Sequence, residues 1–318
     1  MTRAAKVQFE DAFSVIEPEI AEGVHVHPFD SACPVDVRFL KFGKKHSIRL
    51  NRHEYFELLY VHSGEVVYHV HDRYLLMKRG DLFVMGSTLM HRMSEYPKGS
   101  VMATVLYFLP DLIRSGDAPD DALAYLRAFL VQDTAFPHVI PAANGIPARV
   151  AGLIHEIAAL LPAGSVQSRL SVKTYLKMAL VLLMQHYAGY RGSVRVQVQR
   201  EHDLERLRPL FQHVDAKYSS GISVTEAADL LHLGKSSFMR LFKQVTGESF
   251  VGYLNRFRVA KAEVLLASTD MSIAEVGQET GFYDQSYFGV TFRNLLHVTP
   301  KEYRQRLHSD LGREARTK

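Results

Sequence analysis

The pattern of hydrophobic and polar positions changes at Pro110. From about residue 24 to that point, short runs rich in β-branched and aromatic residues, such as 35–40, 56–61 and 66–70, are separated by glycine and other turn residues. Many short strands at regular spacing are typical of a barrel or a sandwich. The pattern therefore predicts a β-barrel over about 24–110.

After Pro110 the apolar residues recur three and four positions apart, which predicts helices. Residues 121–131 and 147–161 show this spacing, and 165–190 form the longest such stretch. That stretch is apolar on all sides, so we expect a helix buried all round, between the barrel and a partner subunit or a neighbouring helix. We expect this helix to mediate dimerisation, with Leu176 and Leu183 at the interface.

Residues 189–202 are polar, contain few large aliphatic side chains and lack helical periodicity, which indicates an interdomain linker. The remainder has the pattern of helices throughout. The prediction is an α+β chain of two domains, with an N-terminal barrel flanked by helices and an all-α C-terminal domain. We expect an N-terminal domain over 1–190 (barrel about 24–110, helices about 119–190), a linker over 191–202, a helical domain over 203–308 and a tail over 309–318.

The helical part contains an internal repeat, in which residues 223–256 match 272–306 at an offset of 49 that rises to 50. Each copy begins with a serine, Ser223 or Ser272, followed three positions later by glutamate, which is the pattern of a helix N-terminus. A turn containing Gly234 or Gly281 follows, and then a second helix with aromatic residues four apart. This is the pattern of a helix-turn-helix unit that occurs twice.

The second helix of each unit is expected to bury its phenylalanine and leucine residues (Phe238, Leu241, Phe242, Phe288 and Phe292). Its opposite face carries residue types that suit a DNA major groove, because arginine reads guanine edges, glutamine reads adenine, and serine and tyrosine bind phosphates or bases. The helix predicted between the units would span about 27 Å, enough to hold two recognition helices roughly one DNA turn apart. The predicted DNA-binding residues are Lys235, Ser236, Ser237, Arg240, Lys243, Gln285, Ser286, Tyr287 and Arg293.

Local charge differs between the two units, although the net charge of the chain is only +4. Residues 235–261 contain six basic residues and one acid, a net charge of +5, whereas residues 272–293 contain one base and three acids, a net charge of −2. Because phosphate contacts dominate affinity for DNA, we expect the first unit to supply most of the phosphate affinity and base recognition. We expect the second unit to recognise bases only weakly.

Composition limits the class of protein. A length of 318 residues suits two domains, and 47% hydrophobic with 23% charged residues is typical of a chain that folds around a core. The single cysteine, Cys33, excludes an internal disulfide framework and a cysteine-based zinc cluster. With no apolar run near the roughly 20 residues of a membrane span and no secretory signal pattern, we expect a cytoplasmic protein without a membrane partner.

Residues 204–308, about a third of the chain, resemble the DNA-binding domain of the AraC/XylS family of transcription regulators. The resemblance is carried by the string over 236–250 and by the segments 281–288 and 298–304. Gly289-Val290 and His297 depart from the family's more common Ser-Arg and glycine. The resemblance implies a nucleoid-associated transcription regulator, here taken as an activator, that binds double-stranded DNA as a homodimer, with RNA polymerase as a further partner.

The N-terminal half resembles a cupin. Residues 51–57 with Gly64 match the first cupin motif except that Asn51 replaces a histidine, and Gly80 followed by His91 resembles the second. In metal cupins these positions bind a divalent ion, but regulators of this family keep a degenerate cupin as an effector pocket. We therefore predict no metal and no other cofactor, with His53, Glu57 and His91 as the candidates should an ion bind. The predicted ligand-binding residues are Arg38, His53, Tyr55, Glu57 and His91.

Two alternatives remain open beside this prediction. One is a metal-dependent cupin enzyme, such as a dioxygenase or isomerase, with an accessory helical domain. The other is a ligand-independent dimeric DNA binder whose barrel serves only for dimerisation. The completeness of the repeat and the missing histidine favour a regulator without enzymatic activity, and the family resemblance implies a small polar effector such as a carbohydrate.

Overall fold

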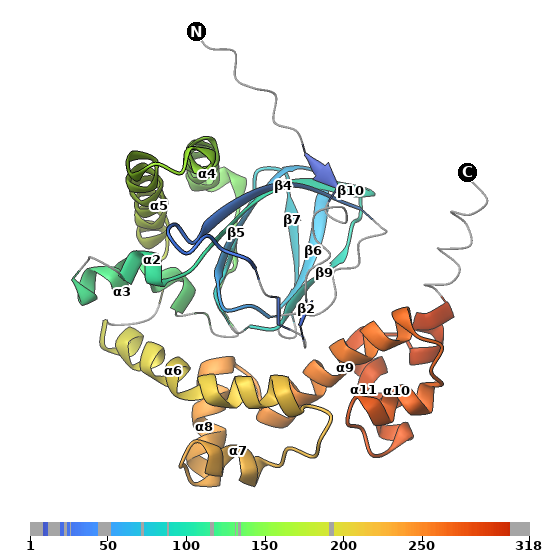
Figure 1. Ribbon diagram of the computed structural model, residues 1–318. Coiled ribbons are helices and arrows are strands. Elements are labelled where there is room, and N and C mark those ends of the chain that lie inside the picture. Colours follow the sequence, from blue (N-terminus) through green and yellow to red (C-terminus); the bar gives the residue numbers. More distant parts are fainter. Residues whose placement is uncertain are drawn as a thin grey trace. The chain divides into compact units, whose positions relative to one another are not determined.

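The computed structural model describes residues 9–11, 20–21, 24–25, 27–43, 52–70, 73–87, 89–114, 118–130, 132, 135–190 and 194–305 (Figure 1). The main division between two compact units falls at Asp203. The N-terminal unit is rich in strands and the C-terminal unit is helical, so the predicted α+β architecture is confirmed. Asn51 and the predicted tail over 309–318 lie outside the described residues.

The described strands form a six-stranded sheet of order β1-β4-β10-β5-β8-β11, a three-stranded sheet of order β7-β6-β9 and the pair β2-β3. The long neighbours β4, β10 and β5 are antiparallel, with Leu40 opposite Ala103 and Glu57 opposite Tyr107. The strands are β1 (Glu10–Asp11), β2 (Ile20–Ala21), β3 (Val24–His25), β4 (Val35–Gly43), β5 (Phe56–Ser63), β6 (Glu65–Val70), β7 (Arg73–Lys78), β8 (Leu82–Met85), β9 (His91–Glu95), β10 (Ser100–Phe108) and β11 (Val139–Ile140).

The two larger sheets share one core. Leu40 and Leu59 of the six-stranded sheet and Val66 and Tyr68 of the three-stranded sheet belong to a single buried cluster. Because side chains alternate between the faces of a strand, the neighbours of these inward residues face outward. Phe56, for example, stacks on Phe129 of a covering helix, with ring centroids 4.7 Å apart.

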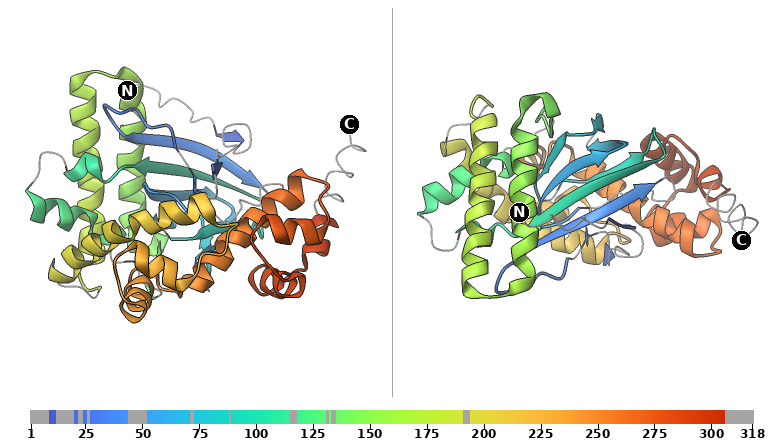
Figure 2. Two further views of the ribbon diagram at one scale, coloured as in Figure 1. Left: turned by 60° about the horizontal axis from the view of Figure 1, so that its bottom comes forward. Right: turned by 90° about the horizontal axis from the view of Figure 1, so that it is seen from above.

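The described part of the N-terminal unit also contains four α-helices, of which α4 and α5 pack side by side and α4 contacts β4 of the six-stranded sheet (Figure 2). They are α2 (Asp111–Arg114), α3 (Pro119–Leu130), α4 (Ile146–Leu160) and α5 (Val166–His186), with short 3-10 turns η1 (Ala142–Asn144) and η2 (Leu161–Ala163). Residues 146–163 are long and apolar enough to cross a membrane by length and composition. Val150, Ile154 and Ile157 of this stretch are buried within the unit.

Helix α5 is not buried all round, so that prediction is wrong. Leu176 and Leu183 are fully buried within the chain itself and cannot contact a partner subunit. The exposed apolar side chains of α5 are instead Val166, Leu170 and Met178, each at least half exposed. They are spaced by multiples of four residues and therefore form a stripe along one side of the helix.

Helix α6 (Val194–Lys217) begins inside the predicted linker, although the sequence there lacks helical periodicity. The alternation of valine with polar residues at 194–199 conceals the helix, because it lacks a 3.6-residue period. The helix is stabilised further along, where Leu207, Leu210 and Phe211 are buried. The segment's role as a linker stays a prediction.

The repeat folds as two similar helix pairs joined by a long helix. The bounds are α7 (Val224–Leu230), α8 (Lys235–Thr246), α9 (Phe250–Ser268), α10 (Ile273–Glu279) and α11 (Gln285–Leu296). Ser223 and Ser272 cap α7 and α10 by accepting the N–H of Glu226 and Glu275. In the second unit the Glu275 carboxylate also accepts the Ser272 N–H at 2.7 Å, which completes the capping box. Glu226 instead lies 3.2 Å from His213.

The turns of the two units differ in a way that the repeat does not reveal. Gly281 has a left-handed backbone with φ of 84°, and its equivalent at the offset of 49 is His232, which has φ of 54°. Gly234 has an extended backbone with φ of −69° and caps α8, as Asp284 caps α11. The two glycines therefore occupy different positions in the turn.

Candidate barrel site and nucleic-acid interface

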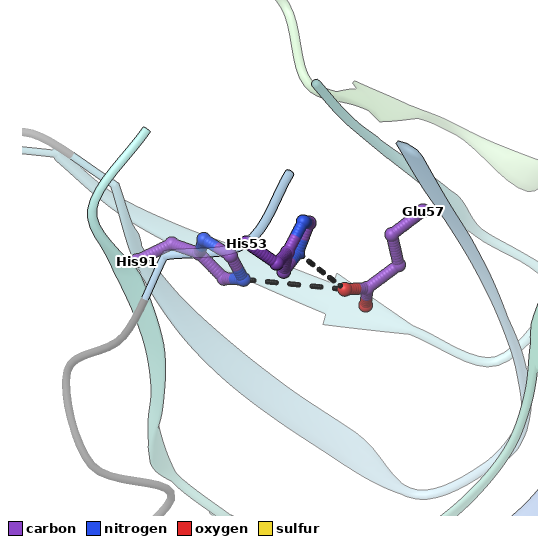
Figure 3. Close-up of side chains that lie close together, drawn as sticks. All are labelled: His53, Glu57 and His91. Carbon is purple, nitrogen blue, oxygen red and sulfur yellow. Dashed lines mark hydrogen bonds and ion pairs between the residues drawn. The ribbon is translucent and has the colours of Figure 1, made fainter. Parts of the chain in front are cut away.

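Three of the predicted ligand-binding residues, His53, Glu57 and His91, meet inside the N-terminal unit (Figure 3). His53 precedes β5, Glu57 lies in β5 and His91 begins β9 of the other sheet. The Nε2 atom of His53 lies 3.2 Å from Glu57 Oε2, and that of His91 lies 4.0 Å from the same oxygen. All three side chains are buried. We call these residues the His-Glu-His triad.

Backbone hydrogen bonds orient both imidazoles. The Nδ1–H group of His53 donates to the Tyr55 carbonyl at 2.8 Å, and that of His91 donates to the Leu89 carbonyl at 2.9 Å. A carbonyl only accepts, so each Nδ1 carries the hydrogen and each Nε2 presents a lone pair toward Glu57. Burial lowers the pKa of His53 to about 3 and that of His91 to about 4, so both rings are neutral at pH 7.

Tyrosines surround the triad. Tyr55 stacks on His53 with ring centroids 3.9 Å apart, and Tyr107 lies 4.8 Å from Tyr55. The Tyr68 hydroxyl hydrogen-bonds Glu57, whose pKa is raised by burial against the opposing effects of His91 and Tyr68. Sequence reasoning missed Tyr68 and Tyr107. The period of two in β6, where Val66, Tyr68 and Val70 face inward, was the available signal for Tyr68.

Arg38, the fifth predicted ligand-binding residue, pairs with Asp36 rather than with the triad. Its Nε atom donates to Asp36 Oδ2 at 2.6 Å, and the same oxygen lies 2.9 Å from His27 Nε2. Burial alone would raise the pKa of Asp36, but hydrogen bonds from His27 and Arg38 outweigh it and lower the pKa. Arg38 shares a face of β4 with inward-facing Leu40, so it lies toward the same interior.

The first predicted recognition helix, α8, separates its two faces as expected. Phe238, Leu241 and Phe242 are buried, and the opposite side is solvent-exposed. The exposed residues include every predicted DNA-binding residue of this unit, Lys235, Ser236, Ser237, Arg240 and Lys243. The arrangement leaves three positive charges and two hydroxyls on one accessible surface.

Half of the positive charge counted over 235–261 is not accessible. Arg256, Arg258 and Lys261 of α9 are buried. The Arg258 guanidinium donates to the carbonyls of Tyr218 and Ser220, each at 2.8 Å. Arg256 lies 3.4 Å from Glu248. The net charge of +5 therefore overstates the charge that DNA can meet, because these bases hold the helices together.

The second predicted recognition helix, α11, also buries its phenylalanines, Phe288 and Phe292. Its predicted DNA-binding residues, Gln285, Ser286, Tyr287 and Arg293, are exposed. The Tyr287 hydroxyl accepts a hydrogen bond from the Asn255 side chain at 2.7 Å, which ties this helix to α9. Only one of the four residues carries a positive charge, so the contrast between the two helices persists at the surface.

A shallow hollow beside α8 adds one residue that sequence reasoning missed. It has a volume of about 170 Å³ and includes Arg206 of α6 together with Ser237, Arg240 and Gln244 of α8. Two guanidinium groups and a hydroxyl around one hollow suit a phosphate. The sequence pattern gave no function for α6, so Arg206 becomes a candidate phosphate contact only because the structure places it beside α8.

Comparison with known proteins matches both halves of the chain. Residues 39–166 match the AraC-like ligand binding domain, and residues 227–306 match a helix-turn-helix domain. The chain is 33% identical over 109 residues to the regulatory protein PocR of Salmonella typhimurium, an alignment that spans 34% of this chain and only 36% of PocR. It is 22% identical over 257 residues to the transcriptional activator RhaR of Mannheimia succiniciproducens, across 81% of this chain and 87% of RhaR.

Among solved structures, ToxT from Vibrio cholerae aligns with a TM-score of 0.47 and 12% identity, over 86% of this chain and 98% of ToxT.

Proposed function

The chain belongs to the AraC/XylS family, and we propose that it is a transcription regulator that binds double-stranded DNA through α8 and α11 and a small polar effector inside the barrel. The observation that carries the proposal is the duplicated helix pair, each with a buried phenylalanine face and an exposed polar face. Such a regulator acts in the cytoplasm at the nucleoid and needs no catalytic step. Activation would add RNA polymerase as a partner.

The first experiment is selection of operator sequences from a random DNA pool by the purified full chain. We expect enrichment of two major-groove contacts about one helical turn, roughly 34 Å, apart. Absence of an enriched motif at both low and moderate salt, with and without a panel of candidate effectors, would contradict sequence-specific binding.

The selected operator then tests the contrast between the two helices. Replacing Arg240 by alanine should weaken binding by about 1–3 kcal/mol, or roughly 5- to 150-fold, if it reads a base edge. Gln285→Ala should cost clearly less at the same salt concentration. Arg206→Ala should weaken binding to all sequences and reduce the salt slope by about 1. Equal losses for Arg240→Ala and Gln285→Ala would refute the contrast.

The barrel residues favour a hydroxyl-rich effector. Glu57 and the two Nε2 atoms are acceptors for hydroxyl groups, and the rings of Tyr55 and Tyr107 offer flat apolar surfaces. We expect a carbohydrate, in agreement with the polar effector inferred from the sequence. A panel of sugars tested by thermal shift should include one that raises the Tm of the native chain, and Tyr107→Leu, which lacks the flat ring, should respond less. A panel without any stabilising sugar would exclude this class.

Homodimerisation is proposed through the exposed stripe of α5, in place of Leu176 and Leu183. Val166 and Leu170 line a shallow depression of about 590 Å³, and Met178 continues the apolar stripe. Leu170→Arg should convert dimer to monomer in sedimentation experiments and leave the helix content unchanged. Gln185→Arg, at an exposed polar position of the same helix, is the matched control. A dimer that survives Leu170→Arg would place the interface elsewhere.

A further inference from the structure

The two predicted recognition helices match each other residue for residue. Helices α8 and α11 each contain 12 residues, and the offset of 50 aligns both their first and their last residues. The sixth residue is Arg240 in α8 and Val290 in α11. The repeat therefore places an apolar side chain in the second helix at the position where the first helix has a guanidinium group.

Val290 lies at the centre of the exposed face of α11. It is two positions from the buried residues Phe288 and Phe292, which places it about 200° around the helix from each of them. Its side chain is 57% exposed. Its neighbours on this face, one helical turn away on either side, are Ser286 and Arg293. A valine thus occupies the middle of a face whose other members are polar.

The surroundings of Arg240 on α8 are the same in kind. Ser236 precedes it by four positions and Lys243 follows it by three, and all three residues are exposed. Each recognition face therefore consists of a serine, a central residue and a base, and the two faces differ in chemistry at the centre. Helix formation does not favour valine at an exposed position, because β-branched residues have a lower helix propensity than arginine.

We infer that Val290 recognises the 5-methyl group of a thymine in the major groove. The inference rests on the proposed DNA binding. Valine has no hydrogen-bonding side chain, and the methyl group of thymine is the apolar group that a base pair presents in that groove. Arg240, at the same position of its helix, suits guanine. The operator should therefore have a thymine in one half where the other half has a guanine, although the two helices are copies of each other.

Gly289 permits the close approach that a short side chain requires. Valine reaches less far from the helix axis than arginine, so α11 must lie nearer to the bases for the contact to form. A Cβ atom at position 289 would have no neighbouring atom within 4 Å, so this position faces open space. Its equivalent in α8 is Met239, whose side chain is 49% exposed. Glycine removes that bulk beside the proposed contact.

The test uses the full chain and its selected operator, in which each thymine is replaced singly by uracil, a base that lacks only the 5-methyl group. One such replacement in the half bound by α11 should weaken binding by about three- to fivefold, the value of burying one methyl group. Val290→Ala should bind the thymine and uracil operators equally. Val251→Ala, at an exposed valine of α9, is the matched control and should retain the full loss.

Operator selection with Val290→Arg provides a second readout. Guanine should replace thymine at the same base pair, with a preference of about fivefold or more, and the half bound by α8 should be unchanged. An operator without a methyl-dependent thymine, a loss that persists in Val290→Ala, or an unchanged base preference in Val290→Arg overturns this inference and leaves the proposed function standing. Failure of the native chain to enrich any operator overturns both.

Discussion

Replacing Gly281 by alanine should destabilise the second helix-turn-helix unit strongly. A Cβ atom at this position would lie 2.8 Å from the Tyr218 carbonyl oxygen and 2.9 Å from the Cα atom of Ser219, on a backbone with φ of 84°. The left-handed backbone costs an alanine about 1–2 kcal/mol, and displacement of neighbouring backbone adds about 1–3 kcal/mol. The reduced entropy of the unfolded chain returns about 0.4–1 kcal/mol, so the net loss lies between about 1 and 4.6 kcal/mol, with a middle value of about 3 kcal/mol.

The equivalent residue of the first unit predicts the opposite sign. His232 is exposed and has φ of 54°, so His232→Gly relieves the left-handed backbone of a residue with a side chain. After the entropy that glycine adds to the unfolded chain, we expect a gain of about 0.5–1 kcal/mol. Gly289→Ala is the matched control for Gly281→Ala, because a Cβ atom at position 289 would have no neighbouring atom within 4 Å. In a helix interior, alanine is more stable than glycine by about 1 kcal/mol, so this variant should be stabilised.

Hydrogen exchange of the full chain, followed by mass spectrometry, separates the two units. Gly281→Ala should lower protection of α10 and α11 by about 100-fold at the middle value and by at least about fivefold, since each 1.4 kcal/mol corresponds to about tenfold. Gly289→Ala and His232→Gly should raise protection of their own units by about two- to fivefold. The reasoning is refuted if Gly281→Ala changes protection by less than about threefold, or if Gly289→Ala lowers it equally.

Three further predictions concern buried contacts. Arg258→Met should lower the free energy of unfolding of the helical unit by about 2–4 kcal/mol, because two backbone carbonyls lose a charged donor. Urea unfolding followed by far-UV circular dichroism measures this loss, and a loss below about 1 kcal/mol contradicts the prediction. Gly86→Ala should lower the Tm of the barrel, because its Cβ atom would lie 2.3 Å from the Phe129 carbonyl oxygen; an unchanged Tm contradicts this. The pKa of Asp36 is lowered below 3.8, so its ionisation stabilises the folded unit above pH 3.8 and this contribution is lost as the pH falls through the folded pKa. Asp36→Asn should therefore flatten the fall in Tm between pH 5 and pH 2, and an equally steep fall in the variant would exclude Asp36 as a cause.

The helical unit was predictable because its signals are local. A serine N-cap, a glutamate three residues later and phenylalanines four apart all lie within one helix or one turn, and the repeat presents them twice. The exposed and buried faces of α8 and α11 follow from the same spacing. Burial of Arg258 was not predictable in this way, because its partners lie about 40 residues earlier in the chain.

The barrel shows the same limit more clearly. His53 and Glu57 were predicted together because they lie close to each other along the sequence, and the second motif supplied His91. Tyr107 was missed because it reaches the site only through the pairing of β10 with β5, where it lies opposite Glu57. Strand register is set by the complete sheet rather than by a local pattern. The sequence therefore reveals the polar residues of such a site, which lie in local motifs, but not the aromatic residues that strand pairing brings beside them.

The effector proposal assigns separate parts of recognition to the triad and to the aromatic ring beside it. Tyr107→Leu removes a flat ring without changing an acceptor atom, and Glu57→Gln removes a carboxylate acceptor without changing the ring. Each variant should therefore reduce the rise in Tm that a stabilising sugar gives the native chain. An unreduced rise in Glu57→Gln would mean that the effector does not contact the triad, and an unreduced rise in Tyr107→Leu would mean that it does not contact this ring.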